Sequence, residues 1–380
     1  MAEVARVGRE VARAAARAVD AEGRFPAETL AALKACGALG AAVPAELGGG
    51  GLGLGALAES CTALAQHCAS SAMILAMHHI QVASLADHRD GSREIDAYLR
   101  RVAAEQRLIA SVTSEVGPGG DMRRSVAAIA EDGARFSLKK QATTISYGRE
   151  ADDLLLTVRR HAGASPHDQV LVLLLAGEYV LTPTGAWDAL GMRGTCSIPA
   201  VVEGGGAPWQ VLATPFGDVA AQSMVPVSHV LWASCWLGIA IDAVAIARAK
   251  LRGEARARAG TLPPEAARLA ETGAKLQLLR SEVSAATADC ARMRAAGDRD
   301  ALASLGTALR MNDLKLSASR LAVDIVGEAL GVCGIAGYRN DSPYSIGRHL
   351  RDVLSAPLMI QNQRLLETNA GLWMVGKGEA

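Results

Sequence analysis

The sequence has no excess of charge of either sign. Its 39 lysine and arginine residues are balanced by 39 aspartate and glutamate residues, and no block of like charge forms a tail. A protein that binds nucleic acid or an anionic membrane electrostatically needs a basic surface. The balance argues against both kinds of partner, so we expect no nucleic acid and no membrane to be bound.

The sequence also lacks paired cysteines and a secretion signal. Its seven cysteines are odd in number, and no two of them form a C-x-x-C pair. Such thiols are typical of small buried apolar groups in a reducing cytoplasm, not of a disulfide framework or a zinc site. Residues 1–20 predict an amphipathic helix that carries acids and bases throughout, without the apolar segment and cleavage site of a signal peptide. We therefore expect a cytoplasmic protein.

Several common motifs are missing as well. No G-x-G-x-x-G segment follows a predicted strand, and the patterns G-x-x-x-x-G-K-[ST], H-E-x-x-H and G-x-S-x-G do not occur. Nucleotide binding by the two usual Gly-rich folds is therefore disfavoured. His78 and His79 are neighbours in a predicted helix and face different directions, which argues against a shared metal ion. We predict no metal site.

Hydrophobic periodicity divides the chain into three blocks. In residues 1–108 apolar side chains recur at three- and four-residue spacing, which predicts helices. In residues 109–225 short apolar runs bounded by Gly, Pro and Asp predict strands and a compact sheet domain. Helical spacing returns in residues 226–380. We expect a domain for each block, with one helical domain before the β domain and one after it.

One apolar segment, residues 230–250, is long enough to cross a membrane. Asp242 lies inside it, and Ser234 and Gly238 interrupt its aliphatic run. An acid within the segment favours a buried packing helix or a subunit-interface helix over a transmembrane one.

Residues 113–121, TSEVGPGGD, break the apolar patterns with two hydroxyls, two carboxylates, three glycines and a proline. Glycines let a backbone turn tightly and approach a ligand, and Thr113 and Ser114 offer short hydrogen-bond donors. On composition alone the stretch is either a surface turn or a ligand-binding loop.

Five segments, in order along the chain, resemble signatures of the acyl-CoA dehydrogenase superfamily. They are VPAELGGGGLG (43–53), SEVGPGGD (114–121), ISYGREAD (145–152), WDALGMRGTCS (187–197) and GYRNDSPYSIGRHLRD (337–352). The resemblance implies an α+β fold with an N-terminal helical domain, a middle β-barrel-like domain and a C-terminal four-helix bundle. It also implies a homodimer or homotetramer built on the C-terminal helices.

The resemblance implies FAD as the cofactor. In the family, the loop matched by residues 113–121 and the segment matched by residues 145–152 hold the flavin ring. Thr113, Ser114 and Ser146 are thereby assigned to the polar rim of the ring. A few convergent donors of this kind orient a flat apolar ring and tune its electron affinity.

A further family contact is less well matched. A family arginine binds the pyrophosphate of a neighbouring subunit's FAD, and Arg256 lies at the matching distance from Gly260. The aromatic residue that precedes the glycine in the family is Ala259 here, and two expected glutamines are missing. The alternative is that Arg256 and Arg258 only solvate a helix end.

The catalytic base departs most from the family pattern. Family dehydrogenases remove the proton next to a thioester with a glutamate, placed either beyond an R-D pair or at the start of the helix after the β domain. Beyond the matching pair, Arg351-Asp352, the first acid is Glu367, which is our candidate base. The second position holds Ser228 and His229. His229 and His349 are weaker candidates.

The leading hypothesis is an FAD-dependent oxidoreductase of the acyl-CoA dehydrogenase type in specialised metabolism. Its substrate would be an acyl thioester carried by coenzyme A or an acyl carrier protein, and the sequence does not indicate the electron acceptor. The missing glutamate leaves two alternatives. One is a flavin monooxygenase on the same fold, because relatives that hydroxylate aromatic or amine substrates with reduced flavin and oxygen also lack this glutamate. The other is a non-catalytic partner subunit.

Overall fold

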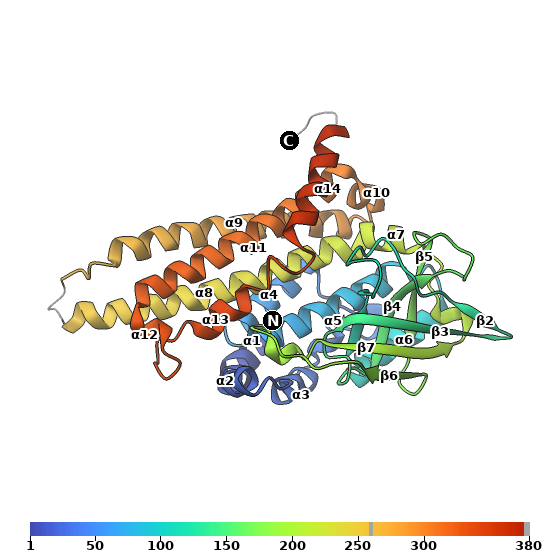
Figure 1. Ribbon diagram of the computed structural model, residues 1–380, viewed down its shortest axis with the longest axis horizontal. Helices are drawn as coiled ribbons and strands as arrows, with labels where there is room; N and C mark the ends of the chain where they lie inside the picture. The colour runs from blue at the N-terminus through green and yellow to red at the C-terminus, as the bar shows by residue number, and fades with distance from the viewer. Residues whose placement is uncertain (258–260, 376–380) are drawn as a thin grey trace.

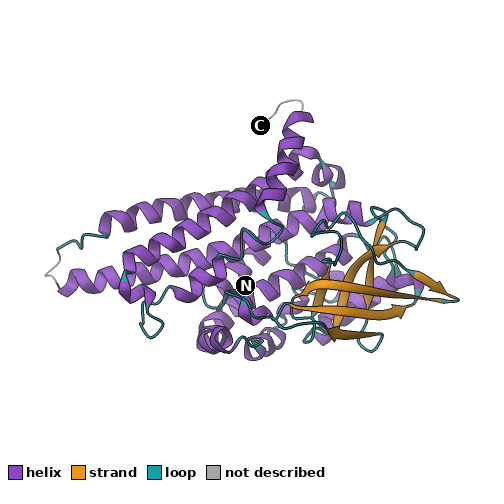
Figure 2. Cartoon of the chain, in the orientation of Figure 1, coloured by secondary structure: helices purple, strands orange, loops and turns teal. Residues whose placement is uncertain are grey.

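The computed structural model describes residues 1–257 and 261–375, and helices form both of its ends in chain order (Figure 1). The strands gather at one end of the elongated molecule (Figure 2). The N-terminal helices are α1 (Ala2–Val7), α2 (Arg13–Glu22), α3 (Ala27–Ala35), α4 (Leu54–Ala65), α5 (Ala69–Asp87) and α6 (Arg93–Glu105). The predicted order of helices, strands and helices is confirmed.

Helix α6 illustrates how local sequence sets these elements. The Ser92 hydroxyl accepts a hydrogen bond from the backbone N–H of Ile95 at 3.2 Å and so caps the helix. Gln106, with φ of 51°, ends it in a left-handed conformation. The buried residues recur at three- and four-residue spacing: Ile95, Tyr98, Leu99 and Val102. One face of the helix therefore packs inward, and the chain leaves the helix at Gln106 and continues into the first strand.

The middle part contains two sheets. Its strands are β1 (Ile109–Val112), β2 (Ala130–Asp132), β3 (Arg135–Ile145), β4 (Asp153–Arg159), β5 (Gln169–Leu174), β6 (Tyr179–Pro183) and β7 (Ile198–Gly206). One sheet has the order β1-β4-β5 and the other β2-β3-β7-β6. Only β1 and β4 run parallel.

The predicted barrel-like closure of the middle domain is not found among the described residues. Single bridges join Ala128 to Arg159 and Val172 to Val211, but no continuous ladder links the two sheets. The strands β4 and β5 are buried on both faces because their apolar runs leave no polar face for solvent. The middle part is therefore two packed open sheets.

The C-terminal part is built on three long helices. Its helices are α7 (Phe216–Val219), α8 (Val225–Ala257), α9 (Ala266–Ala295), α10 (Arg299–Ala303), α11 (Leu305–Cys333), α12 (Ile335–Tyr338), α13 (Gly347–Val353) and α14 (Asn362–Val375). Helices α8, α9 and α11 lie side by side along the long axis, and α14 projects at one side (Figure 1).

Helix α8 is the packing helix that the sequence predicts. It lies against α4, α5, α9 and α11, and its first half is almost wholly buried. A Cβ at Gly238 would lie 2.5 Å from the carbonyl oxygen of Thr62, so glycine is needed for α4 to approach this closely. By length and composition Phe216–Ala257 is the one helix among the described residues that could cross a membrane, but 67% of its apolar window is buried within the protein.

Candidate functional site

Three of the five matched segments meet in space. Ser114, just beyond β1, is hydrogen-bonded to Thr144 near the end of β3. The backbone N–H of Tyr147, which follows β3, donates to the carbonyl of Thr195 at 2.7 Å. Thr195 belongs to a short 3-10 turn, Arg193–Thr195, within the matched segment 187–197. The fold therefore brings the two predicted ring-binding stretches and a third segment to one place.

The two hydroxyls of the first stretch have different surroundings. The Ser114 hydroxyl donates to the Thr144 carbonyl at 2.7 Å and accepts from the Thr144 backbone N–H at 3.1 Å. Thr113 is half-buried, and its side chain has no hydrogen-bond partner within residues 1–257 and 261–375. Thr113 is the hydroxyl that this loop can offer to a ligand, whereas Ser114 holds the loop onto β3.

Ser146 begins a chain of three hydroxyls. Its oxygen lies 2.8 Å from that of Ser197, which lies 2.7 Å from that of Thr195. The Thr195 hydroxyl donates to the carbonyl of Met192 at 2.8 Å. Ser146 is half-buried, while Ser197 and Thr195 are buried. The side chain predicted to face a flavin is thus linked to the interior of the turn.

The backbone around these hydroxyls is strained. Tyr147, Met192 and Cys196 have φ values of 44°, 51° and 46°, in the left-handed region that side chains other than glycine rarely adopt. They are three of six such non-glycine residues in the described chain, and they flank Ser146, Thr195 and Ser197. Strain of this kind tends to gather at functional sites, where the surrounding structure enforces it.

The turn is fixed from outside by the matched R-D pair. The Asp352 carboxylate accepts a hydrogen bond from the backbone N–H of Met192 at 2.7 Å. A Cβ at Gly191 would lie 2.0 Å from the carbonyl oxygen of Arg351, so glycine is required there. Burial raises the pKa of Asp352 above its usual range. The Arg351 guanidinium pairs with Asp20 of α2, so this pair joins three parts of the chain.

A second buried network anchors the loop 113–121. The Glu115 carboxylate accepts hydrogen bonds from the Ser125 hydroxyl at 2.7 Å and from the backbone N–H groups of Val126 at 3.1 Å and Ala127 at 2.6 Å. The Lys140 ammonium lies 3.7 Å from the same carboxylate. Lys140 also donates to the Thr157 carbonyl and hydroxyl. Burial lowers the pKa of Lys140 to about 8.

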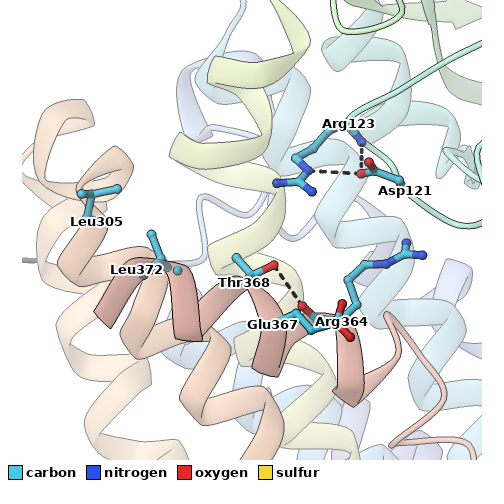
Figure 3. Close-up of a pocket in the computed structure, with 8 residues that line it drawn as sticks. Asp121, Arg123, Leu305, Arg364, Glu367, Thr368 and Leu372 are labelled. Atoms are coloured by element: carbon cyan, nitrogen blue, oxygen red, sulfur yellow. Dashed lines mark hydrogen bonds and ion pairs between the residues drawn. The ribbon is translucent and has the colours of Figure 1, made fainter. Parts of the chain in front are cut away.

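Glu367 lies in a surface pocket of about 690 Å³ between the tip of the loop and α14 (Figure 3). The lining residues are Asp121, Arg123, Leu305, Arg364, Glu367, Thr368, Gly371 and Leu372. The Arg364 guanidinium donates to the Gly119 carbonyl at 2.7 Å and ties α14 to the loop. The exposed Glu367 carboxylate accepts a hydrogen bond from Gln363 at 3.2 Å. None of the three predicted ring-binding hydroxyls lines this pocket.

Two family models match this chain. Residues 1–106 match the model described as "Acyl-CoA dehydrogenase, N-terminal domain", and residues 220–359 match "Acyl-CoA dehydrogenase, C-terminal domain". This chain belongs to the acyl-CoA dehydrogenase family. The family predicted from five short segments is confirmed, and with it the assignment to a group of flavoprotein oxidoreductases.

Individual members of the family are also similar to the chain. Amino sugar nitrososynthase DnmZ of Streptomyces peucetius is 28% identical over 357 residues, which cover 90% of this chain and 84% of that protein. KijD3, solved in complex with FMN and dTDP-3-amino-2,3,6-trideoxy-4-keto-3-methyl-D-glucose, is 25% identical with a TM-score of 0.81, covering 98% of this chain and 92% of the other. The nitrososynthase from Micromonospora carbonacea var. africana has a TM-score of 0.84 at 23% identity, covering 99% of this chain and 95% of the other, and shows the shared fold.

The side chains at the meeting point suit a flavin ring. The Thr113 hydroxyl has no hydrogen-bond partner among the described residues, and the half-buried Ser146 hydroxyl, which is hydrogen-bonded to Ser197, stands in the other stretch. The glycines of the loop at positions 117, 119 and 120 have φ values of 115°, 64° and 82° and present bare backbone. A flat apolar ring with a polar rim needs such a set of few, convergent polar groups.

Each of the other candidate bases uses one ring nitrogen in a buried hydrogen bond. The ring of His229 donates through Nδ1 to the Met311 carbonyl at 2.9 Å, and burial lowers its pKa to about 4. Its Nε2 is buried without a partner in the described structure. His349 is hydrogen-bonded through Nε2 to Asp242 of α8 at 2.7 Å. Each of the two histidines therefore keeps one buried ring nitrogen without a partner among the described residues, Nε2 in His229 and Nδ1 in His349, and only His229 stands at the expected helix start.

Arg256 lies on the last turn of α8 and is exposed. That end of α8 is at the opposite end of the molecule from the strands (Figure 1). Within one chain it is remote from the loop 113–121, so the predicted contact with FAD requires a second subunit and stays a prediction. Arg258, Ala259 and Gly260 lie outside the described residues.

Sequence reasoning missed Ser197, Thr195 and Lys140 as members of the site. The first two stand in the matched segment 187–197, but nothing in a linear sequence says that their hydroxyls reach Ser146. A signal for Lys140 does exist. Apolar residues alternate along β3 at Phe136, Leu138 and Ala142, and Lys140 stands in the same alternation, on the face that the structure buries.

Proposed function

We propose that this protein is a flavin-dependent monooxygenase, the alternative to a thioester dehydrogenase that the sequence leaves open. The observation that carries the proposal is the lack of a free, buried carboxylate at the base positions. A dehydrogenase must remove a weakly acidic proton beside the thioester, and for this it needs a positioned base.

The three acidic residues that are buried as whole side chains in the described structure are already engaged. Glu115 accepts from two backbone amides and a serine. Asp153 is held by Arg107 and by the Tyr98 hydroxyl. Asp352 accepts the Met192 amide. None is available to accept a substrate proton without breaking a buried hydrogen bond, which costs about 1–3 kcal/mol.

Glu367 does not replace them in this arrangement. Its side chain is exposed and lies with Arg364 at the rim of the pocket beside α14. A general base is usually partly desolvated and within hydrogen-bond reach of the proton that it removes. Glu367 would be the catalytic base only if the protein were a dehydrogenase, and we rank that hypothesis second.

The names of the relatives point toward the same chemistry. DnmZ is described as an amino sugar nitrososynthase, and KijD3 was solved with FMN and a dTDP-linked amino sugar. We therefore propose a polar amine as the substrate class, with the amine of a nucleotide-linked sugar as the first to be tested. An exchangeable flavin, FMN or FAD, would be received in reduced form from a reductase.

The contacts of individual residues support the roles that we propose for them. Thr113 and Ser146 would hold the rim of the flavin ring, and Ser114, Glu115 and Asp352 would keep their segments in place. A bound reduced flavin supplies activation of dioxygen, with one oxygen atom passing to the substrate and the other leaving as water. The neutral His229 would accept a hydrogen bond at Nε2 from a substrate amine that reaches it.

The proposal is tested by supplying both chemistries to the purified protein. Reduced FMN from a flavin reductase, dioxygen and a dTDP-linked amino sugar should give a product that is heavier by one oxygen atom or more. Butyryl-CoA and longer acyl thioesters, added without oxygen, should leave the flavin oxidised. Bleaching by a thioester would overturn the proposal in favour of a dehydrogenase. Failure to bind either flavin would favour the non-catalytic subunit.

A further inference from the structure

The three hydroxyls that begin at Ser146 have a fixed direction. A hydroxyl carries one proton to donate, and it can accept through its lone pairs. Thr195 gives its proton to the Met192 carbonyl, which can only accept. Thr195 must then accept from Ser197 at 2.7 Å, and Ser197 must accept from Ser146 at 2.8 Å. We call these three hydroxyls, of Ser146, Ser197 and Thr195, the relay. Each of its protons points away from Ser146 and toward the Met192 carbonyl.

The relay ends at a carbonyl oxygen that accepts from three donors. The Met192 carbonyl also receives the Trp187 indole N–H at 3.2 Å and the backbone N–H of Thr195 at 3.0 Å. Hydrogen bonds that are linked in a chain, as those of the three hydroxyls are, reinforce each other. Asp352 accepts a hydrogen bond from the backbone N–H of the same Met192, which fixes the peptide group just before it.

The direction of the relay determines what Ser146 offers to a ligand. The Ser146 hydroxyl donates its only proton to Ser197, so it can offer a ligand only a lone pair. The N5 atom of an oxidised flavin is an acceptor and gains nothing from a lone pair. In a reduced flavin N5 carries a hydrogen and donates, so the two match.

We propose that Ser197 and Thr195 are positioning residues that hold the Ser146 hydroxyl as an acceptor and so make the site prefer reduced over oxidised flavin. This rests on the proposed function, because it takes the flavin to lie at Thr113 and Ser146 with its N5 atom facing Ser146. It extends that function by explaining how a site without a permanently bound cofactor would select the reduced form delivered to it.

The surroundings of the relay show that its geometry is enforced. Thr195 and Ser197 are 3% and 6% exposed, so water does not compete freely for their hydroxyls. The backbone at Tyr147, Met192 and Cys196 is held in the left-handed region on either side. A surface turn would relax such strain, whereas this one is fixed by packing and by Asp352.

The test compares the binding of two redox states. Dissociation constants of oxidised and reduced FMN are measured without oxygen, by fluorescence or ultrafiltration, for the wild type and for Ser197→Ala and Thr195→Val. Ser197→Ala removes the acceptor of the Ser146 proton, and Thr195→Val frees the Ser197 proton to turn toward Ser146. In both variants Ser146 can then donate to oxidised N5. The wild type should bind reduced FMN more tightly. The ratio of the oxidised to the reduced dissociation constant should fall about tenfold in both variants. That fall lowers the reduction potential of the bound flavin by about 30 mV.

Two controls isolate the relay. Thr195→Ser keeps the hydroxyl and should keep the wild-type ratio. Ser84→Ala removes a buried hydroxyl that donates to the Ile80 carbonyl within α5, and it should change neither constant. An unchanged ratio in both Ser197→Ala and Thr195→Val, or a wild type that prefers oxidised FMN, would overturn the inference. If the wild type also oxygenates its substrate, only the inference fails; if it binds no flavin in either state, the proposed function fails as well.

Discussion

The Asp352 carboxylate accepts a hydrogen bond at 2.7 Å from the backbone N–H of Met192, which lies 160 residues earlier in the chain. The R-D pair at the C-terminal end of the fifth matched segment is therefore a structural clamp on the turn that carries Thr195 and Ser197. Its arginine, Arg351, extends the clamp to Asp20 of α2. A signature that could be taken for catalytic residues here positions the site.

Substitution of Asp352 tests the clamp. Asp352→Ala leaves the Met192 amide buried without a partner and should lower the free energy of unfolding by about 1–3 kcal/mol. Asp352→Asn keeps an acceptor oxygen and should lose less than half of that amount. Urea unfolding followed by circular dichroism measures both. Equal losses for the two variants would show that the charge, and not the hydrogen bond to Met192, fixes the turn.

The broad fold is readable from the sequence because periodicity reports burial. The regular spacing of Ile95, Tyr98, Leu99 and Val102 identifies a helix with one buried face, and that face is the one found. Closure of the middle domain is not readable in this way. Whether β1 pairs with β4 or with another strand depends on contacts between distant segments, and an apolar run such as that of β4 fits several partners.

The residues of the candidate site could also be predicted in part, whereas their contacts could not. Thr113, Ser114 and Ser146 could be selected from the sequence because two short segments resemble family loops. The sequence does not predict that the Ser114 hydroxyl donates to Thr144, because this hydrogen bond depends on how the end of β1 meets β3. The ion pair of Glu115 and Lys140 was hidden for a similar reason, since only the inward face of β3 brings them together.

The different surroundings of Thr113 and Ser114 predict different effects of removing each hydroxyl. Thr113→Val keeps the shape of the side chain and should weaken flavin binding by about five- to tenfold while leaving stability within about 0.5 kcal/mol. Ser114→Ala loses two hydrogen bonds to Thr144 and should lower the free energy of unfolding by about 1–2 kcal/mol. Fluorescence titration with FMN and urea unfolding give the two quantities. A reversed pattern would exchange the roles of the two hydroxyls.

The buried Lys140 predicts a rise of stability with pH. Its pKa is about 8 in the folded protein, whereas an unfolded lysine titrates near about 10.4. The folded state releases this proton first, so the unfolded state binds more protons between these values and stability increases as pH rises through that window. The penalty of the buried charge is fully present below pH 8. Its relief amounts to roughly 3 kcal/mol at most.

Lys140→Met should remove this rise relative to the wild type, as measured by the free energy of unfolding at intervals from pH 7 to pH 10.5. The neighbouring Lys139 is exposed on the other face of β3 and pairs with Glu203, which makes Lys139→Met the matched control. Surface pairs contribute little, so the control should follow the wild type at every pH. A wild-type slope retained in Lys140→Met would place the titration at another group.

Glu367 decides between the two chemistries most directly. In the oxygenase, Glu367→Gln should change the rate of substrate oxygenation by less than about threefold, because the exposed carboxylate makes only a surface hydrogen bond to Gln363. In a dehydrogenase the same change removes the base and should slow flavin reduction by a thioester about a hundredfold or more. The matched control is Gln363→Ala, which removes the hydrogen-bond partner and leaves the carboxylate. Stopped-flow mixing with a dTDP-linked amino sugar and, in a separate series, with butyryl-CoA measures both reactions. A large loss of oxygenation in Glu367→Gln, with Gln363→Ala unaffected, would bring Glu367 into the reacting site and contradict its placement at the surface pocket beside α14.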